Sequence, residues 1–156
     1  MPITITEERP DSPDAMQLIA ELDDVLSPLY AAESRHGFSV EKLLRDGVVF
    51  FVARVDGEPA ACGGLLMVGS EYGEVKRMYV RPQFRGLGLA RKLLHQLAEY
   101  SRQHGVMTLR LETGVHQKEA IGLYESDGFQ RIPPFGSYWD DPVSLCYEKR
   151  LDADNP

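Results

Sequence analysis

The chain has 156 residues, of which 43% are hydrophobic and 26% charged, and its formal net charge is −7. This composition is ordinary for a globular protein and predicts a single domain over residues 1–156 with a core of its own. The acidity argues against nucleic acid as a partner, and no apolar run approaches the ~20 residues of a membrane span.

The two cysteines, Cys62 and Cys146, lie in apolar, strand-like runs. Free cysteine is commonly a core residue, and no histidine cluster accompanies this pair, so we expect buried reduced thiols and no metal site. The first five residues lack a basic region followed by an apolar core, which argues against a secretory signal. The expected compartment is therefore the cytoplasm.

The N-terminal half predicts one strand, two helices and a three-stranded meander. Ser12 before Pro13 is typical of a helix N-cap with proline in the first turn, and Ser27–Pro28 ends or kinks the helix that follows. Residues 29–33 could resume it. Gly63 and Gly64 inside a predicted strand indicate a bulge or a close backbone approach. The expected elements are a strand at 3–6, helices at 15–26 and 39–45, and strands at 48–55, 60–68 and 73–80.

The C-terminal half begins with a glycine turn. A helix is predicted from about residue 87 to 104, with apolar residues at helical spacing and Gly105 at its C-terminal end. A strand at 106–112, a helix at 119–126 and strands at 129–132 and 143–151 follow. The complete order is β-α-α-β-β-β-α-β-α-β-β, an α/β (α+β) chain.

The glycine turn indicates a phosphate site. Gly86 and Gly88 permit conformations that side chains disfavour, and they let a ligand approach the backbone closely. The unpaired N–H groups of the next helix and its dipole suit a pyrophosphate. The turn lacks the Gly-Lys-Ser/Thr of a P-loop, and five residues separate its first glycine from the preceding strand, unlike a Rossmann fingerprint.

Three segments together resemble the GCN5-related N-acetyltransferases (GNAT family). Residues 83–88, Gln-Phe-Arg-Gly-Leu-Gly, are similar to the family's acetyl-CoA-binding motif. Residues 120–129 match its Ala-x-x-Leu-Tyr-x-x-x-Gly-Phe pattern, and residues 74–80 match the strand that enters the turn. The predicted element order is also that of the family.

The resemblance implies a mixed, mostly antiparallel sheet in which two parallel strands, ending at Val80 and Thr113, splay apart. Pantetheine amides would pair with backbone groups in the gap. Acetyl-CoA is the implied co-substrate, with no metal. The implied cofactor-binding residues are Met78, Tyr79, Val80, Arg85, Gly86, Leu87, Gly88, Leu89, Ala90, Arg91, Gln117 and Tyr124. Gln117 stands where the family often has Asn, and Gln can make the same kind of amide contact from a longer stem. The resemblance also allows a homodimer.

The implied reaction is direct attack of an amine on the thioester. Tyr124 matches the family's thiol-protonating tyrosine, and Glu74 lies where several members place a base. His116 is an alternative base, and bulk solvent is another. The structural alternatives are a core tyrosine and a solvated carboxylate.

The resemblance implies that the acceptor lies between residues 29–38 and the loop at 135–141. Aromatic and acidic residues there, with Glu33, Asp140 and Asp141 at the entrance, favour a cationic primary amine of a small molecule. A protein lysine or N-terminus is a weaker expectation. Two other functions stay open: a non-catalytic acetyl-CoA sensor or regulatory module, and a dinucleotide-binding protein.

Overall fold

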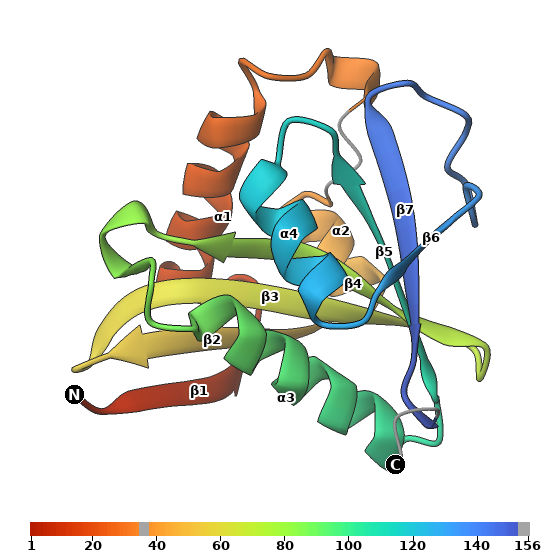
Figure 1. Cartoon of the computed structure of the whole chain (residues 1–156). Helices are drawn as coiled ribbons and strands as arrows, with labels where there is room; N and C mark the ends of the chain where they lie inside the picture. Colours follow the sequence, from red (N-terminus) through yellow and green to blue (C-terminus); the bar gives the residue numbers. More distant parts are fainter. Residues whose placement is uncertain (35–37, 153–156) are drawn as a thin grey trace.

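The computed structural model describes residues 1–34 and 38–152 (Figure 1). The described chain forms seven strands, four α-helices and two short 3-10 helices. The strands are β1 (Ile3–Glu8), β2 (Val49–Val55), β3 (Glu58–Val68), β4 (Tyr72–Val80), β5 (Thr108–Gly114), β6 (Gln130–Ile132) and β7 (Ser144–Arg150). The helices are α1 (Pro13–Leu26), η1 (Ala32–Ser34), α2 (Val40–Arg45), η2 (Pro82–Phe84), α3 (Leu89–Gln103) and α4 (Lys118–Ser126).

All seven strands form one sheet in the order β1-β2-β3-β4-β5-β7-β6. Every neighbouring pair is antiparallel except β4 and β5, which run parallel and are in register only at Gly73↔Leu109 and Glu74↔Arg110. Beyond these pairs the two strands diverge, as Figure 1 shows. The predicted α/β class, element order and splayed parallel pair are confirmed.

The two faces of the sheet carry separate cores. Helices α1 and α2 cover one face, where Leu18 and Leu43 pack against Phe50 and Val52 of β2. Helix α3 packs on the other face through the apolar stripe that contains Leu93 and Leu97. Figure 1 shows α4 on the same side as α3, over the divergent ends of β4 and β5. The gap between these strands is thus flanked by helices from both halves of the chain.

The predicted N-cap at Ser12 is confirmed, and Ser39, predicted as part of the next helix, caps α2. The Ser12 hydroxyl accepts the N–H of Ala15 at 3.2 Å, and the Ser39 hydroxyl accepts the N–H of Lys42 at 3.2 Å. Helix α1 is not resumed after Leu26, because turns follow it and lead into η1. The remainder of the predicted acceptor segment, residues 35–37, lies outside the described part of the chain.

The starts of α3 and β5 differ from the prediction for local reasons, while most other boundaries shift by one or two residues. Helix α3 begins at Leu89 because Gly88 adopts a left-handed conformation, φ 76°, at its N-cap. Strand β5 begins at Thr108 because the preceding residues close α3: Gly105 has φ 76°, and the Val106 N–H donates to the Ser101 carbonyl at 2.9 Å. Cys62 and Cys146 are both buried and free, as expected. Within residues 1–34 and 38–152, no helix is long and apolar enough to cross a bilayer.

Candidate active site

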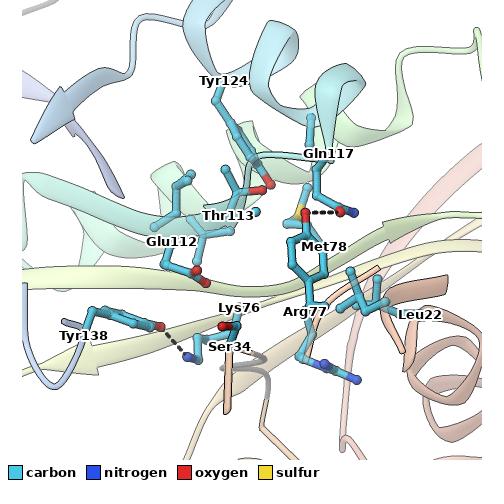
Figure 2. A pocket seen from close by; sticks show the side chains of 16 residues that line it. Leu22, Ser34, Lys76, Arg77, Met78, Glu112, Thr113, Gln117, Tyr124 and Tyr138 are labelled. Atoms are coloured by element: carbon cyan, nitrogen blue, oxygen red, sulfur yellow. Dashed lines mark hydrogen bonds between the residues drawn. The ribbon is translucent and has the colours of Figure 1, made fainter. Parts of the chain in front are cut away.

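A cavity of about 130 Å³ occupies the gap between β4 and β5 (Figure 2). Backbone groups of the diverging strands line it, so the gap offers polar partners to an extended ligand. Side chains from both faces of the sheet close it. The cavity is lined by Leu22, Leu26, Tyr30, Ser34, Val75, Lys76, Arg77, Met78, Leu111, Glu112, Thr113, Gly114, Gln117, Ala120, Tyr124 and Tyr138.

A bulge in β4 shapes this gap. Arg77 has φ 56°, and the register between β3 and β4 shifts between Cys62 and Gly64. The Met78 side chain lies directly over Gly63, at the shift, in space that a Cβ on this residue would occupy. Met78 therefore fits between β3 and the cavity. The prediction of a bulge or close approach at these glycines is confirmed.

The glycine turn has the predicted backbone. Gly86 and Gly88 have φ 84° and 76°, and no atom lies within 4 Å of a Cβ built on either. The Lys92 N–H donates to the Gly88 carbonyl, so the N–H groups of residues 89–91 precede the first helical bond. The turn thus presents backbone donors beside open space. Leu87 packs against the core and fixes the turn to the sheet.

The basic side chains near the turn are already engaged. Arg91 donates to Asp127 at 3.0 Å and to Ser126 at 2.8 Å, which ties α3 to the end of α4. Arg85 lies 3.8 Å from the carboxylate of Glu119, and both side chains are largely exposed. An exposed pair of this kind is weak, so Arg85 can exchange Glu119 for a phosphate at little cost.

Tyr124 projects from α4 into the cavity, and Figure 2 shows its hydroxyl pointing toward Thr113. Its ring packs edge-on against Phe129, with centroids 5.8 Å apart, in the buried core. Burial, with a smaller contribution from the charge of Glu112, raises the pKa of the phenol well above its ordinary value. The hydroxyl thus keeps its proton and is available as a hydrogen-bond donor.

Glu112 is a candidate that the sequence analysis did not identify. It projects from β5 into the same cavity as Tyr124 (Figure 2) and accepts a hydrogen bond from Ser144 at 2.7 Å. Burial raises its pKa, against the lowering effects of Ser144 and of the nearby charge of Lys76. A carboxylate with a raised pKa is a suitable proton acceptor near neutral pH. A carboxylate at the end of the predicted strand at 106–112 was the available signal.

Glu74 lies elsewhere. It is 6% exposed, and it does not line the cavity that contains Tyr124. Its carboxylate accepts a hydrogen bond from Tyr138 at 2.5 Å and pairs with Lys76 at 3.2 Å. It is therefore neither the solvated carboxylate considered above nor a direct neighbour of Tyr124.

Tyr30 connects the segment after α1 to the start of α4. Its hydroxyl accepts the His116 N–H at 2.9 Å and donates to Oε1 of Gln117 at 2.8 Å. Because the Tyr30 hydroxyl donates its proton to Oε1 of Gln117, the NH₂ group of Gln117 is available to donate a hydrogen bond to a ligand. The His116 ring packs against Tyr30 and is not part of the cavity lining, which weakens its candidacy as a base.

The acidic residues of the predicted acceptor entrance have different environments. Asp141 is buried and accepts hydrogen bonds from the Ser34 hydroxyl at 2.6 Å and the Val143 N–H at 3.1 Å, so it shapes the loop. Asp140 is exposed, and the side chain of Glu33 is outside the described atoms. Among the residues that the structure describes, no cluster of His, Cys, Asp and Glu could hold a metal ion.

Comparison with known proteins identifies the protein family of this chain. Residues 14–129 match the model of the Acetyltransferase (GNAT) family. The chain is 43% identical over 150 residues to an IAA acetyltransferase of Azospirillum brasilense, covering 96% of this chain and 98% of that protein. The fold matches a putative acyl-CoA N-acyltransferase from Klebsiella pneumoniae, with a TM-score of 0.81, 37% identity and coverage of 96% and 97%.

A PaiA N-acetyltransferase from Thermoplasma acidophilum, solved with coenzyme A, has the same fold at 20% identity, with a TM-score of 0.75 over 96% of this chain and 99% of that one. The chain belongs to the GNAT acetyltransferase family. It is an acetyl-CoA-dependent N-acetyltransferase, and acetyl-CoA is its co-substrate.

Proposed function

We propose that this enzyme acetylates the primary amine of a small molecule by direct attack in the β4–β5 cavity. One observation carries the proposal: a tyrosine hydroxyl from α4 and a partly buried carboxylate from β5 line one small cavity at the point where the two strands separate. Direct transfer needs an acceptor for the amine proton and a donor for the thiolate, and these two groups have those properties.

The cofactor would enter from the glycine turn. The backbone of residues 85–90 would bind the pyrophosphate, with Arg85 released from Glu119 and Arg91 held near the helix start by Asp127. The pantetheine would pair with the backbone of Met78 and Val80, and with the Gln117 amide. Tyr79 would contribute through its backbone, because its hydroxyl donates to Glu21 of α1.

Tyr124 would act at the thioester sulfur. Because its pKa is raised, it is a weak acid, and it would stabilise the developing thiolate by donating a hydrogen bond as the proton moves. The Thr113 hydroxyl lies beside it in Figure 2. Glu112 would accept the amine proton from the other side of the cavity. Glu74, which does not line this cavity, would act only indirectly on that proton.

The acceptor would reach Glu112 from the side formed by Ser34 and Tyr138. The cavity volume of about 130 Å³ and the aromatic walls favour a compact amine over a peptide chain. The net charge of −7 would attract a cation at long range, but the ammonium of Lys76 lies close to the reacting groups. An amine that also carries a polar or acidic group is therefore within the proposed class.

An acceptor panel tests this proposal. Thiol release from acetyl-CoA would be measured with small aromatic amines, polyamines, amino acids and IAA, and with lysine-containing and free N-terminal peptides. We expect kcat/KM to be highest for a small primary amine. Turnover confined to peptides would contradict the small-molecule assignment, and cofactor binding with no amine-dependent thiol release would return the chain to the sensor alternative.

A further inference from the structure

A second cavity, of about 340 Å³, lies beside the first and shares two lining residues with it, Lys76 and Tyr138. It is formed by α2 and the residue before its cap, by β3 and β4, and by the loop between β6 and β7. Its apolar and aromatic lining residues are Phe38, Leu66, Val68, Tyr72 and Tyr138. The cavity can therefore hold the part of an acceptor that does not react.

Three charged side chains line the second cavity: Lys42, Glu74 and Lys76. Glu74 and Lys76 pair with each other at 3.2 Å, and both side chains are less than a tenth exposed. The same Glu74 oxygen accepts the Tyr138 hydroxyl, whose oxygen accepts a hydrogen bond from Lys76 at 3.0 Å, drawn as a dashed line in Figure 2. Since these three groups satisfy one another, Glu74 is a poor anchor for a cationic group of the acceptor.

Lys42 is the charge of this cavity that can change partners. Its ammonium pairs with Asp46, one turn further along α2, at 3.0 Å, and the two side chains are 42% and 29% exposed. A pair this exposed is weak, and Asp46 does not line the cavity. The Lys42 nitrogen also lies 4.5 Å from the centre of the Phe38 ring, so it stands at the aromatic wall. An anion in the cavity can therefore replace Asp46 at little cost.

We propose that the acceptor carries its amine and an acidic group at opposite ends of an aromatic body. This inference rests on the proposed function. The amine lies beside Glu112 in the first cavity, the body packs against Phe38 and Tyr138, and the acidic group pairs with Lys42. Two cations and one carboxylate give the lining of the second cavity a positive balance, although the whole chain is acidic. An α-amino acid does not fit this arrangement, because its carboxylate lies next to its amine.

A matched pair of acceptors tests the acidic group. Thiol release from acetyl-CoA would be measured with 4-(aminomethyl)benzoate and with 4-(aminomethyl)benzamide, which has the same shape and no charge. We expect kcat/KM to be about 5-fold higher for the benzoate, through its KM, because Lys42 lies outside the first cavity and stabilises ground and transition states equally. Phenylalanine, an α-amino acid, should be a poorer acceptor than the benzoate.

Substitutions of Lys42 test the partner. Lys42→Gln should lower kcat/KM for the benzoate to the value for the benzamide. Lys42→Glu should reverse the preference, so that 4-(aminomethyl)benzylamine, a diamine, becomes a better acceptor than the benzoate. The KM for acetyl-CoA in each variant checks that the cofactor site is still folded.

The matched control is Arg45→Gln. Arg45 lies on the same helix and 3.9 Å from the same Asp46 carboxylate, but it lines neither cavity. The variant removes one positive charge from α2 and should keep the preference for the benzoate.

Four results would overturn the inference and leave the proposed function intact. They are equal use of benzoate and benzamide, a preference that persists in Lys42→Gln, an equal loss in Arg45→Gln, and turnover of other small amines with none of the benzoate. Absence of turnover with every amine would overturn the proposed function itself.

Discussion

Gly114→Ala is the sharpest test of the packing that holds the two sides of the cavity together. A Cβ on Gly114 would lie 2.0 Å from the Tyr30 hydroxyl oxygen and 2.2 Å from the ring carbon that bears it. Carbon atoms in contact are about 3.5–4.0 Å apart, so the tyrosine must retreat by roughly 1.5 Å. That displacement breaks its hydrogen bonds to His116 and Gln117.

The expected cost follows from these contacts. The two partly buried hydrogen bonds of Tyr30 contribute about 1 kcal/mol each, and partial loss of packing around its ring, in a residue that is 8% exposed, adds about 1 kcal/mol. Replacing glycine returns about 0.4–1 kcal/mol through the unfolded chain. We expect a net loss of about 2 kcal/mol in the free energy of unfolding, and a rise in the KM for acetyl-CoA as Gln117 loses its partner.

Urea denaturation with a double-mutant cycle measures this coupling. In a Tyr30→Ala background the obstructing ring is gone, so adding Gly114→Ala should cost less than about 0.5 kcal/mol. The matched control is Gly122→Ala in α4, where no atom lies within 4 Å of the new Cβ and a gain of up to about 1 kcal/mol is expected. Equal destabilisation by Gly114→Ala in both backgrounds would refute the reasoning.

Three further predictions concern the reaction. Tyr124→Phe should lower kcat roughly 10- to 1000-fold with little change in acetyl-CoA affinity, and wild-type kcat in a steady-state assay would return Tyr124 to a packing role. A valine at Gly86 or Gly88 should weaken acetyl-CoA binding by calorimetry while circular dichroism still shows a folded chain, since both glycines have positive φ; unchanged affinity would remove the pyrophosphate assignment. A base must be ionised to accept a proton, and burial raises the pKa of Glu112, so kcat should fall as the pH drops through a value above the ordinary pKa of ~4.3 of glutamate. Glu112→Gln should abolish this acidic limb of the pH–rate profile. An unaltered pH profile in the variant would show that another group takes the proton.

The order of the elements could be predicted because it is encoded locally. Ser12 and Ser39 are caps, Gly105 ends a helix, and alternating apolar residues define the strands. The glycine turn could also be predicted, since Gly86 and Gly88 adopt the positive φ that glycine allows. These features depend on interactions within a few residues, and sequence patterns record such interactions well.

The composition of the cavity depends on distant contacts and could not be predicted. Tyr30 meets Gln117 across 87 residues, and Tyr138 meets Glu74 across 64. Alternation along β5 does not single out Glu112, because Leu111 and Thr113 line the cavity as well, and only the divergence of β4 and β5 brings Glu112 into the same cavity as Tyr124. The Glu74–Lys76 ion pair is local, since the two residues lie two positions apart on β4, but its burial depends on the distant Tyr138, whose hydroxyl donates to Glu74.

The most direct test of the account is a crystal structure with coenzyme A and a bound amine acceptor. We predict that the pyrophosphate lies on the backbone of residues 85–90 and that the thiol sulfur lies within hydrogen-bond distance of the Tyr124 hydroxyl. The amine nitrogen should lie beside the Glu112 carboxylate, in the cavity that both residues line. A sulfur atom outside the β4–β5 gap, or an acceptor nitrogen remote from Glu112, would contradict the account.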